Sequence, residues 1–267
     1  MILPELQGNF PNYDIVFFIS ADDIYFNSYG KNLISSIRQH FNYPIHFHLY
    51  NPSENTKNFC ISNNISYTYE YFNQNLVNEA FEIYKLPNQE WEFSRRRSKM
   101  IKIGENIEKL RDELVRTYYA CTRFIRLDQI LKKPTYVIML DTDSLVRKFF
   151  NLPKRNYDIH IFEKSHKKHV PYTQHLASTI FYTGSNACRN LIQDHAKLIL
   201  KEYDKNTFYW FLDQETLDIA IQKYNKNPLS QEFVDFDMNV DSYIWCAKGK
   251  RKFEDDWITE SAKYQIL

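Results

Sequence analysis

The sequence predicts an α/β fold built on an open, mainly parallel twisted sheet with helices on both faces. Two observations lead to this fold class. Short apolar segments rich in β-forming residues alternate with segments whose apolar residues recur at helical spacing, which is typical of βαβ units. One apolar segment, residues 136–140, also runs directly into the acidic pair Asp141 and Asp143, and open sheets bind ligands at the carboxyl ends of their strands.

Each expected element follows from its apolar pattern and from the turn residues that bound it. In chain order they are a strand at 13–20, a loop at 21–25, a helix at 28–41, a strand at 44–50, a short helix at 53–61, a strand at 66–72, a helix at 105–131, the strand before Asp141, strands at 157–162 and 177–182, and helices at 186–203 and 213–224. Residues 73–104 are polar and aromatic and receive no assignment, and residues 165–175 are expected to form a flexible loop.

Composition limits the class of function. The 267 residues suit a single domain with a substantial core, and the formal net charge of +1 gives no reason to expect a nucleic-acid partner. The five glycines are not clustered, which argues against a glycine-rich dinucleotide fingerprint and against a P-loop. Four scattered cysteines, no signal peptide and no membrane-spanning apolar run predict a cytoplasmic protein without a transmembrane segment.

The acidic pair at the end of the 136–140 strand is the strongest candidate site. Two carboxylates this close repel each other unless a cation lies between them, and oxygen ligands favour a hard divalent ion, Mn²⁺ or Mg²⁺. Such an ion can hold a diphosphate and stabilise it as a leaving group. The alternative is that Asp141 and Asp143 form a solvated turn or a helix cap, since aspartate favours both.

Asp22 and Asp23 follow the first strand, at the place that corresponds to Asp141 and Asp143 in a parallel sheet. Because the loops at the ends of parallel strands converge at one edge, these four acids are predicted to share a cleft. Asp22 can accept a hydrogen bond from a nucleotide base, and Tyr25 offers a face for stacking. The alternative for Asp22 is a cap of a turn or of the next helix.

Three further segments have both a functional and a structural interpretation. Arg123 can reach a phosphate from the helix before the acidic pair, or it can belong to a solvated helix face. Asp213 and Gln214 can hold a sugar or an acceptor hydroxyl, but Asp213 as a simple helix N-cap is the plainer explanation. Lys248 and Lys252 belong to a basic run around a glycine that can hold a phosphate, or that can be an ordinary solvated charge run.

Taken together, four segments resemble the GT-A glycosyltransferases, and their layout is most similar to family 8, which includes bacterial lipopolysaccharide galactosyltransferases and glycogenin. The segments are residues 14–25, residues 117–143, the Asp-Gln motif within 211–215, and residues 246–252 in the register of a closing His-x-x-Gly-x-x-Lys motif. The resemblance implies a single GT-A domain over 1–267, with a nucleotide-sugar half at 13–146 and an acceptor half at 147–252.

The resemblance also implies a role for each site residue. Asp141 and Asp143 would bind Mn²⁺ (or Mg²⁺) on the diphosphate of a nucleotide-sugar donor, a UDP-sugar, with Asp141 also near the sugar. Asp213 and Gln214 would lie beside the sugar as it passes, with retention of configuration, to a saccharide or other hydroxyl acceptor. The residues expected to hold the donor are Ser20, Ala21, Asp22, Tyr25, Arg123, Thr142, Lys248 and Lys252.

The sequence departs from the family pattern at three places. Cys246 stands where the family usually has a metal-binding histidine. Either another residue, such as Asp241, supplies the missing ligand, or the two aspartates, the phosphates and water hold the metal. Residues 176–179 hold no asparagine, although the family has an Asn-Ala-Gly segment there, and Ile24 replaces a polar residue of the base-binding loop.

Three other classes of function fit parts of the pattern. A haloacid-dehalogenase-type phosphatase also has Asp-x-Asp after an apolar strand, but near its N-terminus and with Thr or Val where Leu145 stands here. A nucleotidyltransferase would need a glycine-rich opening loop. A degenerate, non-catalytic sugar-nucleotide binder is the third class, and Cys246 is the residue that favours it.

Overall fold

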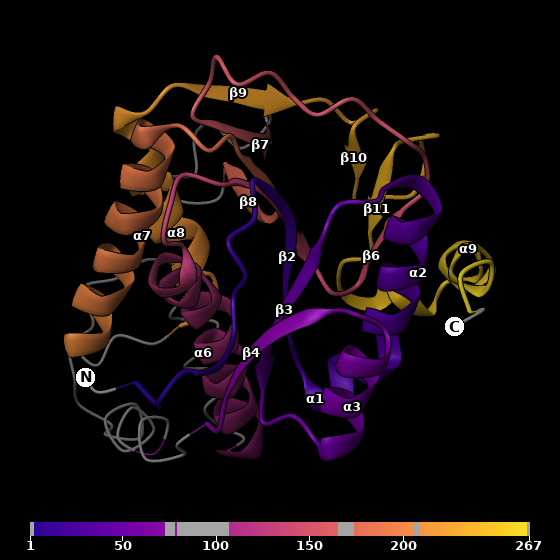
Figure 1. The fold of residues 1–267 in the computed structure, drawn as a ribbon, viewed down its shortest axis with the longest axis horizontal. Coiled ribbons are helices and arrows are strands. Elements are labelled where there is room, and N and C mark those ends of the chain that lie inside the picture. The colour runs from indigo at the N-terminus through magenta and orange to yellow at the C-terminus, as the bar shows by residue number, and fades with distance from the viewer. Residues whose placement is uncertain (1–2, 73–77, 79–106, 165–173, 206–208, 266–267) are drawn as a thin grey trace.

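Figure 1 shows the computed structural model, which describes residues 3–72, 78, 107–164, 174–205 and 209–265. The strands are β1 (Gln7–Gly8), β2 (Ile15–Asp22), β3 (Ile45–Tyr50), β4 (Ser66–Glu70), β5 (Tyr136–Asp141), β6 (Ser144–Val146), β7 (Ile159–Glu163), β8 (His175–Tyr182), β9 (Lys226–Leu229), β10 (Val234–Asp235) and β11 (Ile244–Cys246). The helices are α1 (Asp23–Tyr25), the π-helix η1 (Phe26–Gly30), α2 (Lys31–His40), α3 (Glu54–Ser62), α6 (Ile107–Ile130), α7 (Asn186–Asp204), α8 (Leu212–Ala220), the 3₁₀-helices η3 (Ile221–Lys223) and η4 (Gly249–Phe253), and α9 (Asp255–Ala262).

The main sheet has eight strands in the order β1-β4-β3-β2-β5-β8-β7-β9. The neighbours from β4 to β5 are parallel, as are β7 and β9, whereas β8 is antiparallel to both of its neighbours and β1 is antiparallel to β4. The predicted α/β class and mainly parallel sheet are therefore confirmed. The strand order reverses direction between β2 and β5, and open sheets bind ligands at such a switch point.

The alternation of side chains along the central strands gives the sheet two apolar faces. Val16 and Phe18 of β2 join one buried cluster, and Phe17 and Ile19 join the other, because successive side chains of a strand point to opposite faces. Helices α6, α7 and α8 cover the first face, and α2 and α3 cover the second (Figure 1). This arrangement is the predicted one, with helices on both faces.

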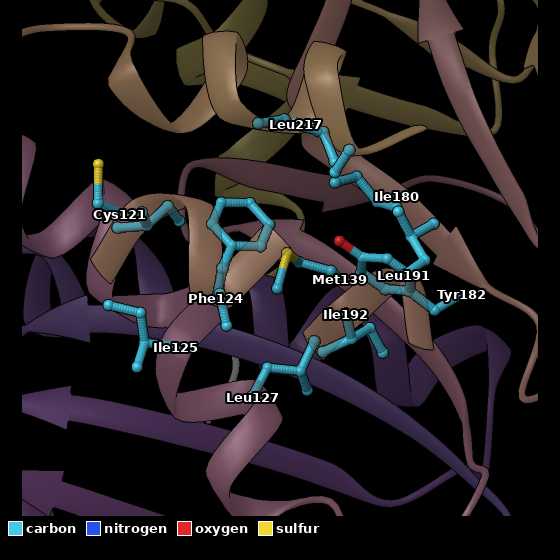
Figure 2. Packing of buried hydrophobic residues seen from close by; sticks show 14 of the residues in the cluster. Cys121, Phe124, Ile125, Leu127, Met139, Ile180, Tyr182, Leu191, Ile192 and Leu217 are labelled. Atoms are coloured by element: carbon cyan, nitrogen blue, oxygen red, sulfur yellow. The ribbon is translucent and has the colours of Figure 1, made fainter. Parts of the chain in front are cut away.

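Figure 2 shows the first of these clusters at close range. Met139 of β5 and Ile180 of β8 pack with Phe124 and Leu127 of α6 and with Leu191 of α7, and each of these side chains is almost wholly buried. Helix α6 is therefore anchored over the two central strands by apolar contacts. One consequence is that the polar residues of the same helix, Arg123 among them, are fixed in position against the sheet.

The prediction of a loop at residues 21–25 is wrong. Strand β2 continues to Asp22, and the helical turn α1 begins at Asp23. The Asp22 carboxylate accepts a hydrogen bond of 2.7 Å from the backbone N–H of Tyr25, which satisfies a donor that the start of a helix leaves free. Helix α1 then leads without a break through η1 into α2.

A second, three-stranded sheet brings the end of the chain back to the acidic pair. Strand β6 follows Asp143 directly, and β11 pairs with it antiparallel so that Cys246 lies opposite Ser144. The backbone N–H of Ala247 also donates to the carbonyl of Asp143 at 3.1 Å. Residues 246–252 are thereby placed beside β5, although about a hundred residues separate them in sequence.

Several expectations lie wholly or partly outside the described residues. These are the unassigned segment 73–104 and most of the loop at 165–175, of which the structure places His175 in β8. None of the described helices is long and apolar enough to span a membrane. The division into halves at residue 146 stays a prediction.

Gly184, which follows β8, is expected to be essential for stability. Its φ is +76°, and a Cβ there would lie 2.8 Å from the carbonyl carbon of Thr135 and 2.9 Å from the nitrogen of Tyr136, both backbone atoms. Gly249 has a similar φ of +61° but open space around its Cα. We expect Gly249→Ala to lower the free energy of unfolding by about 1 kcal/mol through the left-handed backbone alone. Gly184→Ala should cost about 1–3 kcal/mol more through overpacking.

Urea denaturation of both variants measures this difference. Equal losses of unfolding free energy in the two variants would contradict the close packing at Gly184.

Candidate active site

The acidic pair lies at the switch point of the sheet. Asp141 is the last residue of β5 and is paired in register with Ser20 of β2. The Thr142 hydroxyl donates to the Ser20 carbonyl at 2.7 Å, so the turn after β5 is tied to the end of β2. Asp143 completes this turn before β6 begins. The ends of the two central strands therefore form one rigid unit that carries both carboxylates.

Arg123 joins the acidic pair to a third carboxylate. Its guanidinium donates to Asp141 Oδ1, to Asp213 Oδ2 at 3.3 Å and to the carbonyl of Ala177 at 3.0 Å. Only 10% of its side chain is exposed, so the interpretation as part of a solvated helix face is wrong. Burial alone lowers the pKa of Arg123, but the carboxylates of Asp141 and Asp213 outweigh this effect and raise it.

Asp213 does not cap its helix. The N-cap of α8 is Phe211, which has a left-handed backbone with φ +80°, and Asp213 lies within the first helical turn. Its carboxylate is buried against Arg123, and burial raises its pKa despite that partner. A ring nitrogen of His195 lies 3.1 Å from the Asp213 carbonyl. The helix start thus places Asp213 on the guanidinium that also binds Asp141, and the next residue, Gln214, is also buried.

Asp143 has a cation of its own. Lys252 Nζ lies 2.9 Å from Asp143 Oδ2 and donates to the Tyr25 hydroxyl at 2.8 Å. The same ammonium lies 4.7 Å from the centre of the Tyr25 ring and 5.0 Å from that of Tyr29, which adds cation–π attraction. Burial and the charge of Asp141 raise the pKa of Asp143, and Lys252 offsets part of this rise.

Cys246 is close to both carboxylates. One ligand atom from each of Asp141, Asp143 and Cys246 can be chosen so that all three lie within 4.8 Å of one another. Burial and the two carboxylates raise the pKa of the Cys246 thiol. Asp241, the expected substitute ligand, instead pairs with Lys148 and has a side chain that is 74% exposed, so that expectation is wrong.

The other residues predicted for the site lie in different surroundings, and one of them faces away from the acidic pair. Asp23 does not turn toward the acidic pair, since its carboxylate accepts from the N–H of Ser53 at 2.8 Å and from the Ser53 hydroxyl at 2.9 Å. The expectation that four acids share one cleft is wrong for this residue. Ala21 is buried in β2. The Lys248 ammonium lies 4.5 Å from the centre of the Phe236 ring.

Sequence analysis missed an irregularity of β8 beside the site. Ile161 and Phe162 are consecutive in β7, yet they pair with Ile180 and Leu176 of β8, so residues 177–179 bulge on that side. Bulges often redirect groups next to active sites, and here the carbonyl of Ala177 is the acceptor for Arg123. Among the described residues, the buried hydroxyls of Ser178 and Thr179 have no hydrogen-bond partner. No pattern in the sequence signals this bulge.

The donor set at the acidic pair fits a divalent cation. Asp141 and Asp143 offer the oxygen ligands that Mn²⁺ and Mg²⁺ prefer, and their side chains are 29% and 15% exposed, which leaves a solvent side. The Cys246 sulfur is a softer ligand. Chemically, the arrangement can hold a cation against an anionic ligand, with Lys252 and Arg123 supplying fixed positive charge.

The comparison with solved structures identifies the fold of the chain. No protein-family model matches the sequence, and no curated protein matches it. Among the solved structures that match in fold is the bifunctional glycosyltransferase WbbM, which is 15% identical in sequence; the match covers 97% of this chain and 51% of WbbM, with a TM-score of 0.54. The galactosyltransferase LgtC, in complex with donor and acceptor sugar analogues, is 13% identical; the match covers 94% of this chain and 97% of LgtC, with a TM-score of 0.56. The glycosyltransferase GlyE of Streptococcus pneumoniae TIGR4 is 11% identical; the match covers 94% of this chain and 60% of GlyE, with a TM-score of 0.54. The chain thus spans about half of WbbM and three fifths of GlyE. It has the GT-A glycosyltransferase fold, as predicted.

Arg123 is expected to be a major contributor to stability. In Arg123→Met the carboxylate of Asp213, with 8% of its side chain exposed, would lose its cationic partner. Removing one member of a buried ion pair typically lowers the free energy of unfolding by about 3–5 kcal/mol. The matched control is Arg116→Met on the same helix, because the Arg116 side chain is 64% exposed and surface pairs contribute less than about 1 kcal/mol. Chemical denaturation monitored by circular dichroism gives both values, and similar losses would contradict the buried network.

Proposed function

We propose that this protein is a metal-dependent glycosyltransferase that moves a sugar from a UDP-sugar to a hydroxyl of a glycan or lipopolysaccharide-type acceptor. The observation that carries the proposal is the pair Asp141 and Asp143 at the switch point of a GT-A sheet, with Arg123 and Lys252 bonded to them. Acids held together with adjacent cations suit a site for a diphosphate and its counter-ion.

The nucleoside part of the donor is assigned to the end of β2. Tyr25 is 41% exposed and offers its ring for stacking beside Tyr29. The Asp22 carboxylate accepts one backbone hydrogen bond and, as an acceptor with about four lone-pair sites, has capacity for a base or ribose donor. Ser20, Ala21 and Thr142 form the tied strand ends beneath this surface, so their role is to hold its backbone in place.

The diphosphate is assigned to the space between the acidic pair and η4. When bound, a divalent cation, Mn²⁺ or Mg²⁺ as the sequence predicts, neutralises the diphosphate and stabilises it as a leaving group. Asp141 and Asp143 would hold that cation. Lys252 would turn from Asp143 to donate to a phosphate oxygen, and Lys248 lies two residues beyond Cys246 on the same segment.

The transferred sugar and the acceptor are assigned to the Asp213 side. Arg123 holds Asp141 and Asp213 in one orientation, so it acts as a positioning residue for both. Asp213 and Gln214 would hold hydroxyls of the sugar and of the acceptor. The bond from the sugar to phosphate breaks, the acceptor oxygen bonds to the same carbon, and its proton passes to the departing phosphate. Retention of configuration belongs to this proposal because the family resemblance implies it.

The alternatives are separated by their chemistry. A haloacid-dehalogenase-type phosphatase needs a free nucleophilic aspartate, whereas Asp141 is bonded to Arg123, and the fold is GT-A. A nucleotidyltransferase lacks support because Gly30, the glycine nearest the end of β2, packs against Phe26 and Phe47. A non-catalytic binder would bind UDP-sugars without releasing UDP.

Release of UDP from UDP-sugars tests the proposal directly. We expect slow release that requires a divalent cation, stops with EDTA and speeds up when a suitable acceptor is present. Asp141→Asn and Asp143→Asn should each lower the rate at least about 100-fold, because each removes charge that the transition state requires. Asp241→Asn is the matched control and should behave like wild type, since this acid is exposed and paired with Lys148.

Two results would overturn this proposal. Cation-dependent hydrolysis of p-nitrophenyl phosphate with no release of UDP would favour the phosphatase. Binding of UDP-sugars with no turnover under any acceptor would favour the degenerate binder.

Lys252 is expected to affect the nucleotide and the cation in opposite directions. In Lys252→Met, UDP binding in the presence of Mn²⁺ should weaken about tenfold, the value of one charge-assisted hydrogen bond. Binding of Mn²⁺ alone should strengthen, because a positive charge 2.9 Å from Asp143 is removed. Lys250→Met is the control, since Lys250 is an exposed residue of the same 3₁₀-helix. Isothermal calorimetry at low salt measures both affinities, and parallel changes in the two would contradict the assignment.

A further inference from the structure

The ligand set at the acidic pair is chemically mixed. Two of its members are carboxylates and the third, Cys246, is a thiol. Hard ions such as Mn²⁺ and Mg²⁺ favour oxygen, whereas thiolate ligands favour softer ions such as Zn²⁺. The identity of the third ligand therefore bears on which cation the site selects.

Cys246 cannot easily turn away from the carboxylates. It is the last residue of β11, paired with Ser144 of β6, and its side chain is 1% exposed. The next residue, Ala247, donates from its backbone to the Asp143 carbonyl at 3.1 Å. Backbone hydrogen bonds thus join the strand that carries the sulfur to β6 and to the turn that carries Asp143. Such a framework holds ligands in place before a metal arrives.

The sulfur differs from the other thiols in its surroundings. Cys60, Cys121 and Cys188 are also buried and free, but the described residues place none of them in a group of potential metal ligands. Cys246 is the thiol whose sulfur lies within 4.8 Å of a carboxylate oxygen of both Asp141 and Asp143. A cation bound among the three groups could take all of them as ligands, because a coordinating thiol is deprotonated.

The distances allow a shared ion after small rotations of the side chains. The three ligand atoms lie within 4.8 Å of one another, and zinc binds carboxylate oxygen at about 2.0–2.2 Å and sulfur at about 2.3 Å. In the tetrahedral geometry of zinc, an oxygen and a sulfur ligand of one ion are then about 3.6 Å apart, so the ligand atoms must approach one another slightly. The partly exposed carboxylates are the members that can move, since Cys246 is held by its strand.

We propose that Cys246 Sγ is the third protein ligand of this site. The sulfur would make the site more selective for Zn²⁺ or Co²⁺ over Mn²⁺ and Mg²⁺ than a site formed by the two carboxylates alone. This inference rests on the proposed function, because it concerns the cation that would hold the donor diphosphate. On binding, the S–H bond breaks, its proton passes to solvent, and the sulfur bonds to the metal. Water or phosphate oxygen completes the coordination.

A titration with Co²⁺, without any sugar nucleotide, tests the sulfur directly. A thiolate bound to Co²⁺ gives a sulfur-to-metal charge-transfer band in the near ultraviolet, and oxygen ligands do not. We expect the band in wild type and its loss in Cys246→Ser. Cys60→Ser, which alters a buried thiol outside the site, should keep it. Competition with Zn²⁺ should remove the band and give the Zn²⁺ affinity.

Metal affinities provide the second measurement. In Cys246→Ser, Zn²⁺ affinity should fall at least about tenfold, while Mn²⁺ affinity changes little, because the lost ligand is the soft one. Cys246→Ala is a second variant should the serine hydroxyl disturb folding, and circular dichroism verifies that each is folded. Co²⁺ binding to wild type without the charge-transfer band, or an unchanged ratio of Zn²⁺ to Mn²⁺ affinity in both folded variants, would overturn the inference.

The outcomes also separate this inference from the proposed function. If Mn²⁺ supports UDP release and no sulfur band forms with Co²⁺, Cys246 is not a ligand but sugar transfer stands. If the band forms and no UDP-sugar is bound or cleaved with any of these ions, the thiolate site stands and the transferase assignment falls.

Discussion

The structure of the site depends on one buried guanidinium. Arg123 contacts carboxylates from β5 and α8 and a backbone carbonyl from β8, so a single side chain links three elements at this edge of the sheet. Its own position is fixed by Phe124 and Leu127, which pack into the apolar cluster beneath it (Figure 2). A buried ion pair is stable only when its geometry is held in this way. The core therefore determines the orientation of Asp141 and Asp213.

The same principle explains how three acids can lie close together. Asp141 and Asp213 share Arg123, and Asp143 has Lys252. The two cations differ in their partners, since Arg123 has three acceptors on three elements, whereas Lys252 contacts Asp143 and Tyr25 from a 3₁₀-helix. In the proposed function, Arg123 is part of the scaffold, and Lys252 is the cation that would turn to an entering phosphate.

The sequence was sufficient for six of the eight strands of the main sheet and for the acidic pair, because both are local signals. A strand such as 136–140 is an unbroken apolar run, and Asp141 and Asp143 follow it immediately. The choice between the functional and the structural interpretation of Arg123 and Asp213 depends on contacts that no local pattern encodes. Arg123 has the same spacing as a surface arginine, and its burial follows from how α6 packs. Asp213 has the composition of an N-cap, but the left-handed backbone of Phe211 moves the helix start by two residues.

Strand β11 brings the end of the chain back to the acidic pair. The groups that surround the two carboxylates could therefore not be inferred from residues 136–143 alone. Strand β11 places the Cys246 sulfur opposite Ser144, and η4 then extends Lys252 to the outer side of Asp143. One short segment, residues 246–252, therefore brings both a thiol and an ammonium to carboxylates that lie about a hundred residues earlier. Because a single β-ladder positions both groups, a change in the pairing of β6 and β11 would displace the proposed third metal ligand and the proposed phosphate contact together.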